Sequence, residues 1–255
     1  MAPTTDAQQT GSAGASGHTS LFVRNWTRAE AWRFFEPHPG GGDPDYGDIA
    51  NRLQFGVRRE ARRYEFLGAL QYVQFGGLPT GAVGPGELGV GAAYYGHSGR
   101  TDSRQLYLRY LHLRLKELAP GLSVQVGRMG FTGGAEITSA DPKIETVKRQ
   151  RVTSRLLGEF EWSIYQRGYD GLRVDWDRRD WHVSAEAFSP TQGGFEEVAG
   201  RRMPSIHVFA ASLTARPGGL APGAETQLFA YRYNDRRGVA ARPDNSGRPA
   251  DRVDV

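Results

Sequence analysis

The sequence predicts an all-β fold of the transmembrane kind, an antiparallel β-barrel with about nine strands. Three observations predict it: stretches of about ten residues alternate between apolar and polar side chains, short and long connections alternate between them, and no run of about eighteen apolar residues occurs. The clearest pair covers residues 169–176 and 181–188, joined by the turn 177–180. A period of two gives a strand two different faces, and about ten tilted residues suffice to cross a bilayer.

Composition supports this fold class and excludes others. The mean hydropathy of −0.54 argues against membrane helices but not against a barrel, because only every second barrel residue faces lipid. The absence of cysteine excludes a disulfide scaffold and cysteine chemistry. The net charge of +4 comes from 32 basic and 28 acidic residues scattered along the chain, so no nucleic-acid surface is expected. The aromatic residues suit strands and, near segment ends, the girdles of a barrel.

The first three expected strands each have one apolar and one polar face. They cover residues 20–35, 48–59 and 63–75. Residues 36–46, between the first two, are rich in Gly and Pro, which cannot continue a ladder. The apolar faces are expected to consist of Leu21, Val23, Ala29 and Ala31 in the first strand, Leu53, Phe55 and Val57 in the second, and Phe66, Leu70 and Tyr72 in the third.

Six further strands are expected after the first three. The sixth and seventh form the hairpin 169–188, and the eighth and ninth flank the Gly/Pro-rich loop 217–223. Alternation is weak in the eighth, so its register stays open. The other ranges are 103–115, 122–129, 205–216 and 224–234. The fourth strand is expected to place Leu106, Leu108 and Tyr110 opposite Gln105, Tyr107 and Arg109, and the fifth to place Leu122, Val124 and Val126 on one side.

The connections between these strands alternate in length. Long ones follow the first and third strands, the latter a glycine-rich loop over residues 76–100, and short ones follow the second and fourth. Outer-membrane barrels have short periplasmic turns and longer extracellular loops. A soluble sandwich has no reason to keep this rhythm, so the rhythm favours the membrane.

Residues 130–164 interrupt the strand pattern. The pair Asp141-Pro142 is typical of a helix start. A loop with structure of its own, between two barrel strands, could fold into the lumen or stay outside, and the sequence leaves both open. The short helix is expected from Ile144, Val147, Leu156 and Leu157.

The chain divides into three expected parts: a flexible N-terminal segment 1–19, barrel strands over 20–235, and a polar, loop-like tail 236–255. No secretory signal is visible in the first part. Bacterial single-chain barrels have an even number of strands. Nine strands followed by a polar tail therefore predict that a second half of the barrel is missing.

The polar face of the strands carries the candidate pore-lining residues. Arginine suits a pore for carboxylate-bearing solutes, because its planar guanidinium binds carboxylates bidentately and stays charged when confined. Carboxylates on the same face would balance the field and hold the arginines apart. Alternatively, the charges form a network that only stiffens the wall. The candidates are Arg24, Arg28, Arg52, Arg58, Arg109 and Arg173, with Glu30, Glu65, Asp175 and Glu186.

No catalytic, metal or cofactor site is expected. The stretch Gly84–Gly89 matches a dinucleotide-binding pattern but follows no strand–helix unit. His182 and Ser184 lie two residues apart on one strand, without the nucleophile elbow that a triad with Asp175 would need. The six His have no metal-ligand spacing. The chain is therefore expected to be a conduit and not an enzyme.

Several short motifs resemble those of the alginate export porins, outer-membrane proteins with an eighteen-stranded barrel. They are the Arg-rich first strands, Gln105–Arg109, Val126–Met129 and Arg167–Arg173, although Met129 stands where the family commonly has Gln. The resemblance spans about residues 20–235 and would correspond to the N-terminal half of such a barrel. It adds Arg128 to the pore-lining candidates. By parity alone Arg128 would face lipid, unless a bulge changes the register.

The resemblance implies a Gram-negative outer-membrane channel for the passive transport of an acidic polysaccharide or oligosaccharide, alginate-like in charge. Its expected partners are this anionic saccharide, outer-membrane lipid, and a second half-barrel or oligomer partner. A general porin without saccharide preference is a further reading. The runner-up is a soluble all-β carbohydrate-binding module, with Trp26 and Trp32 stacking on sugar rings. The orientation of the apolar faces distinguishes the porin from the carbohydrate-binding module, because these faces point outward in a porin and form a buried core in the module.

Overall fold

The strands form one antiparallel sheet in which each pairs with its neighbours in chain order. The computed structural model describes residues 17–33, 45–81, 90–131, 133–153, 157–195, 199–237 and 253–254. The strands are β1 (His18–Arg33), β2 (Asp45–Glu60), β3 (Tyr64–Gly76), β4 (Ser103–Ala119), β5 (Leu122–Met129), β6 (Tyr169–Asp177), β7 (Trp181–Pro190), β8 (Ile206–Ala215), β9 (Thr226–Asp235) and the two-residue β10 (Val253–Asp254). The all-β prediction with nine antiparallel strands is therefore confirmed.

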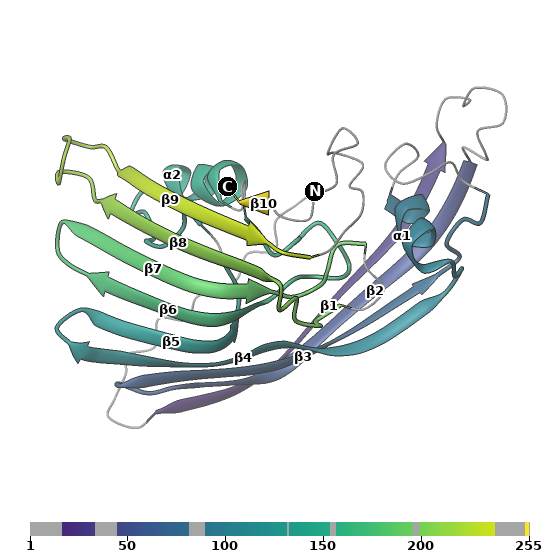
Figure 1. Ribbon diagram of the computed structural model, residues 1–255, viewed down its shortest axis with the longest axis horizontal. Helices are drawn as coiled ribbons and strands as arrows, with labels where there is room; N and C mark the ends of the chain where they lie inside the picture. The colour runs from purple at the N-terminus through teal and green to yellow at the C-terminus, as the bar shows by residue number, and fades with distance from the viewer. Residues whose placement is uncertain are drawn as a thin grey trace.

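The sheet bends into a trough, and the helices lie on its concave side (Figure 1). Short turns join β2 to β3, β4 to β5 and β6 to β7 at one end of the strands, here called the turn end. Longer connections join β1 to β2, β3 to β4, β5 to β6 and β7 to β8 at the opposite end, the loop end. The predicted alternation of short and long connections is thus present.

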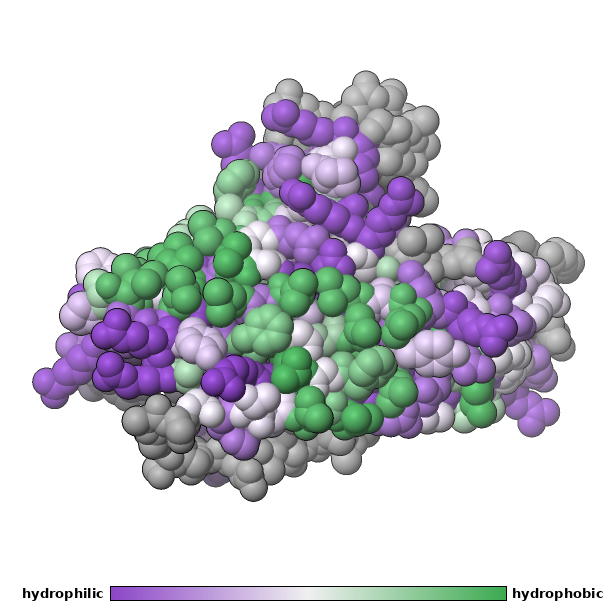
Figure 2. All heavy atoms as spheres, turned by 90° about the horizontal axis from the view of Figure 1, so that it is seen from below, coloured by the Kyte–Doolittle hydropathy of each residue, from purple (hydrophilic) through white to green (hydrophobic). Residues whose placement is uncertain are grey.

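The two faces of the sheet differ in chemistry. Strand register places Leu21, Leu53, Leu106 and Val126 on the convex face, where no second sheet covers them in the described part of the chain. Leu21 is 83% exposed. Figure 2 shows hydrophobic side chains gathered across the middle of this face, with hydrophilic ones toward its ends. The apolar residues that a soluble sandwich would bury therefore point outward.

A bulge in β4 changes which side chains face inward. The pairing of β3 with β4 shifts between Ala69 and Leu70, so that Ala69 opposes Tyr110 while Leu70 opposes Leu108. Arg109 and Tyr110 therefore both turn to the concave face, and Leu111 takes the convex side. The expectation that Tyr110 shares the face of Leu108 is wrong, because an inserted residue reverses the alternation beyond it.

Two helices occupy the longer connections. The glycine-rich connection between β3 and β4 contains α1 (Val90–Ser98), where only a loop was expected. The predicted short helix is present in part as α2 (Pro142–Val147), with Asp141 accepting hydrogen bonds from two backbone N–H groups at its start. A π-helical turn over 148–152 extends it. The expectation that the helix includes Leu157 is wrong, because the helical turns end by Val152. In the described residues, neither helix has the length and apolarity needed to span a membrane.

Both edges of the sheet are open in the described part of the chain. β1 pairs with β2 alone, and β9 pairs with β8 and with the short β10. Several expectations lie outside the described residues: the segment 1–16, the dinucleotide-like stretch Gly84–Gly89 and most of the tail. The end of the first expected strand at 34–35 and Leu156 of the expected helix also lie outside them.

Candidate functional site on the concave face

The connection between β5 and β6 lies inside the trough, which decides the alternative that the sequence leaves open. Glu136 accepts a hydrogen bond from Gln227 Nε2 of β9 at 2.6 Å. Lys148 contacts Glu225, just before β9, at 2.5 Å. Farther along the same connection, residues 159–168, here called the inner segment, lie against β1 to β4. The connection therefore bridges both walls of the trough.

Three of the predicted pore-lining arginines hold the inner segment through its backbone. Each donates a hydrogen bond from its guanidinium to a carbonyl oxygen of the segment. The bonds join Arg28 to Trp162 at 3.2 Å, Arg52 to Ser163 at 2.9 Å and Arg109 to Arg167 at 2.7 Å. A guanidinium has several N–H donors in a fixed plane, so it can bond to a carbonyl and still meet a second partner. We call these three the segment arginines.

The bulge in β4 creates a buried charged cluster beneath the inner segment. Arg109 is 1% exposed and pairs with the carboxylate of Glu159. Tyr110 donates its hydroxyl proton to the same carboxylate at 2.8 Å. Since a buried charge needs partners that replace its hydration, Glu159 depends on both residues. Only the bulge lets two successive residues reach it.

Aromatic packing fixes the middle of the inner segment. Tyr94 of α1 lies 2.8 Å from Ser163 Oγ and accepts a hydrogen bond from the Ile164 amide at 2.8 Å. Burial raises the pKa of Tyr94, so its hydroxyl stays protonated at neutral pH. Phe75 and Tyr165 pack against this ring. The helix missed by sequence reasoning thus clamps the segment against the wall.

Trp26 and Trp32, the sugar-stacking candidates, are both engaged on the concave face. The guanidinium carbons of Arg28 and Arg52 lie 5.1 and 5.0 Å from the Trp26 ring centroid. Trp32 donates its indole N–H to Glu30 at 2.7 Å and stacks on Tyr46. Cation–π contacts of this kind place guanidinium groups against an aromatic face. A sugar ring would have to displace them to stack on Trp26.

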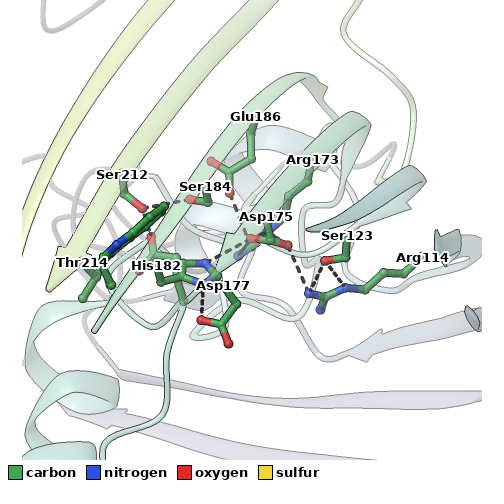
Figure 3. Close-up of polar contacts among 12 residues, drawn as sticks. Arg114, Ser123, Arg173, Asp175, Asp177, His182, Ser184, Glu186, Ser212 and Thr214 are labelled. Carbon is green, nitrogen blue, oxygen red and sulfur yellow. Dashed lines mark hydrogen bonds and ion pairs between the residues drawn. The ribbon is translucent and has the colours of Figure 1, made fainter. Parts of the chain in front are cut away.

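A second charged cluster lies toward the turn end and is centred on Asp175 (Figure 3). Its carboxylate meets Arg173 at 2.8 Å, Arg114 at 3.3 Å and His182 Nε2 at 3.3 Å. Arg173 also reaches Glu186, at 3.4 Å. These residues come from β4, β6 and β7, and β5, which lies between β4 and β6, contributes Ser123 as a further partner of Arg114.

On β2 and β3 a looser set of charges lies at the same end. Arg58 contacts Glu65 at 3.0 Å and Glu60 at 3.7 Å, and Lys116 contacts Glu60 at 2.8 Å. The Arg58 side chain is 50% exposed, whereas Asp175 and Glu186 are 3% and 4% exposed. We call Arg58, Arg114 and Arg173 the turn-end arginines. Within the described residues their guanidinium groups contact carboxylates and, for Arg114, the Ser123 hydroxyl, but no backbone carbonyl.

Strand register places ten of the eleven predicted pore-lining residues on the concave face. The exception is Arg128, which lies on the convex face opposite Leu111 and pairs with Asp170 through two contacts of 2.7 Å. Gly127 before it has a φ of +119°, and a Cβ there would collide with the Leu111 carbonyl oxygen. The ten are Arg24, Arg28, Arg52, Arg58, Arg109, Arg173, Glu30, Glu65, Asp175 and Glu186. Whether they contact a solute stays a prediction.

Sequence reasoning missed several residues of these clusters as site candidates, among them Tyr110, Arg114, His182 and Glu159. Arg114 turns inward only after the bulge, and the leucines offer a signal: they occupy 106 and 108 and then 111, 113 and 115, a change of phase within one strand. His182 was weighed only for catalysis, and its inward parity beside Asp175 was a usable signal. Glu159 lies in a connection, where no periodicity indicates its direction.

Comparisons with known proteins leave the family open. No family model and no curated protein matches the chain. Among solved structures, the chain is similar to OprB of Pseudomonas putida, an outer-membrane porin, with 13% identity and a TM-score of 0.46. The alignment covers 86% of this chain and 52% of OprB, so the chain spans about half the length of that protein. A likeness of this size carries no argument, and the resemblance to alginate export porins is not confirmed.

Proposed function

We propose that this chain forms a large part of the wall of an outer-membrane β-barrel channel for hydrophilic, anionic solutes. The observation that carries the proposal is the division of the sheet into an apolar convex face and a charged concave face. Leu21 and Leu228, on strands at opposite edges of the sheet, are 83% and 64% exposed on the convex side. A monomer in water rarely exposes an apolar surface that crosses a whole sheet. In a membrane, lipid would contact the apolar convex face and water would solvate the charged concave face, so each surface meets a solvent of its own polarity.

The preference for anions follows from which charges the lumen presents. The carboxylates of Asp175 and Glu186 are nearly covered, while half of the Arg58 side chain is exposed. Arg24 also lies on the concave face and is exposed. At the turn end, the carboxylates of Glu60 and Asp177 are exposed, at 53% and 55%. Each of these carboxylates lies against a basic side chain, Arg216 for Asp177 and Lys116 for Glu60, so the exposed Arg24 and Arg58 add positive charge to the trough, an arrangement that favours anions.

The inner segment gives the channel its narrow point in this proposal. It crosses the concave face of β1 to β4 and is held there by the segment arginines. A passing carboxylate would then meet the exposed Arg24 and Arg58 on the turn-end side of this narrowing. An acidic saccharide suits such a path, because an extended chain can pass a constriction that a compact solute of equal mass cannot. The anionic saccharide is thus the proposed cargo.

The channel wall needs further strands to close. In hydrocarbon each unpaired backbone N–H or C=O is costly, so the edge of β1 and the part of the β9 edge beyond β10, open in the described part of the chain, require partners. The partners proposed here are strands that pair antiparallel with both edges. A second copy related by an axis along the barrel would bring β9 parallel to β1, since the two run in the same direction in a sheet of alternating strands. Additional strands that are not a second copy of β1 to β9 can pair antiparallel with both edges and so avoid this parallel contact.

Detergent-dependent folding tests the membrane assignment first. The protein is refolded with and without a mild detergent, and strand content is followed by circular dichroism and by heat modifiability on a gel. Strand structure that needs detergent supports the barrel wall. A monodisperse β protein in plain buffer would contradict it and return attention to the carbohydrate-binding module.

Ion selectivity in planar bilayers that contain the completed barrel tests the anion preference. Arg24→Glu and Arg58→Glu are each expected to lower the ratio of anion to cation permeability, because both side chains face the lumen. Arg179→Glu, in the exposed turn between β6 and β7, is the matched control and should leave the ratio unchanged. Unaltered selectivity in both lumen variants would remove the pore-lining assignment.

A further inference from the structure

Basic residues line the convex face near the loop end, on the lipid side of the proposed wall. Arg104 opposes Gln74, Arg232 opposes Phe209, and His207 precedes the apolar part of β8 on the same face. All three are exposed. Toward the turn end, each of these strands continues with apolar convex residues such as Leu106, Phe209 and Leu228. The basic groups therefore lie directly beside the apolar band, at the level where a bilayer meets water.

A hollow of about 570 Å³ opens on this face between β4 and β7. Its apolar wall includes Leu108, Leu111 and Leu172, and its polar wall includes Arg128 and Arg202. The hollow forms because β4 and β5 diverge: they pair at the turn end, while residues 103–110 of β4 pair with β3 alone. It thus joins the apolar band on one side and the basic groups on the other.

The two arginines of the hollow have different partners. Arg128 is neutralised by Asp170 and also donates to the carbonyl oxygens of Leu108 at 3.0 Å and Gly200 at 2.6 Å. It bridges the gap where the strands diverge. Arg202 is exposed, and within the described residues its side chain donates one long hydrogen bond, of 3.4 Å, to Ser189. The hollow therefore keeps a net positive charge beside a leucine wall.

We propose that this hollow binds an anionic, phosphate-bearing lipid of the leaflet on the loop side, with the phosphate at Arg202 and an acyl chain over Leu108, Leu111 and Leu172. The proposal rests on the channel function, since only membrane insertion brings lipid to this face. Charge complementarity selects an anionic headgroup, and the leucine wall selects an amphiphile over a free ion. Arg232 of β9 and Arg104 of β4 extend the positive surface on which further headgroups would lie.

Lipid retention by the inserted protein tests the site. The protein is inserted into vesicles of phosphatidylcholine alone or of equal parts phosphatidylcholine and phosphatidylglycerol, extracted, and analysed for bound lipid by native mass spectrometry. Phosphatidylglycerol is expected to be retained in preference to phosphatidylcholine. Arg202→Gln should lower its retention about fivefold, which corresponds to about 1 kcal/mol for one basic group at an anionic surface. Arg232→Gln should lower it less, because that residue lies outside the hollow.

A matched control and a soluble competitor separate the outcomes. Arg59→Gln removes a convex-face arginine at the turn end, and it should leave lipid retention unchanged. An equal loss with Arg59→Gln, or equal retention of both lipids, would overturn the site while leaving the channel intact. Displacement by glycerol phosphate at equal concentration would mean a phosphate-ion site and would also overturn it. Failure of the completed barrel to insert into either vesicle would contradict both this proposal and the channel.

Discussion

The segment arginines and the turn-end arginines share residue type, strand parity and face, yet they meet different partners. Arg28, Arg52 and Arg109 donate to backbone carbonyls of a connection that crosses the trough. Arg58 and Arg173 meet carboxylates on the strands themselves. The first group therefore holds the inner segment against the wall, although Arg28 and Arg109 also pair with Glu30 and Glu159. The second group joins strands of the wall and balances its charge.

The difference teaches that an arginine on the concave face does not necessarily line the pore, because another part of the chain can cover it. A guanidinium covered by the inner segment no longer meets solvent, as the 1% exposure of Arg109 indicates. The half-exposed Arg58 still does. The predicted arginines therefore divide into two sets with separate expected consequences on substitution.

The largest effect is expected at Arg109. Arg109→Met would leave Glu159 buried with one partner, Tyr110, and the loss of one member of a buried ion pair typically costs about 3–5 kcal/mol. Urea unfolding in detergent measures the free energy of unfolding. The double variant Arg109→Met/Glu159→Met should recover much of the loss, because neither charge then remains unpaired. No recovery in the double variant would contradict the cluster.

Asp175→Asn should have the next largest effect. The change weakens contacts to Arg173, Arg114 and His182 together, and hydrogen bonds to charged groups contribute about 1.5–3 kcal/mol. The same unfolding measurement applies, and Asp180→Asn in the adjoining exposed turn is the control. A loss no larger than that of the control would mean that the cluster does not stiffen the wall.

Arg52→Gln is expected to cost about 1 kcal/mol, through the bond to Ser163 and the contact with Trp26. Its sharper consequence is local, since the inner segment loses one of its anchors. Limited proteolysis should cut residues 159–168 faster in this variant than in Arg58→Gln. Equal cleavage would remove the distinction between the two groups of arginines.

Arg58→Gln should have the smallest effect on stability, about 0.2–1 kcal/mol, because its pairs with Glu65 and Glu60 are half-exposed. The effect should shrink further in high salt, which screens exposed charges. Unfolding at low and high ionic strength measures this. A loss as large as that of Asp175→Asn would show that exposure does not separate the turn-end charges.

Most of the strand layout could be predicted from the sequence, since period-two alternation reports directly on a sheet whose faces meet different surroundings. The face of Leu53, Phe55 and Val57 follows in this way. The bulge at Arg109 and the helix α1 were not predicted from this alternation. A bulge is one inserted residue within an otherwise regular strand, and α1 is rich in glycine and aromatic residues without an apolar stripe.

The amino-acid sequence alone determined that the chain is an antiparallel sheet with an outward apolar face and an inward charged one, because these properties depend on neighbours along one strand. It also determined the alternation of short and long connections. Which arginines are covered, which carboxylates they meet and where the β5–β6 connection lies depended on tertiary structure. Those contacts join residues such as Arg109 and Glu159, which are fifty positions apart in the sequence. A local sequence pattern carries no information on contacts between residues so far apart in the chain.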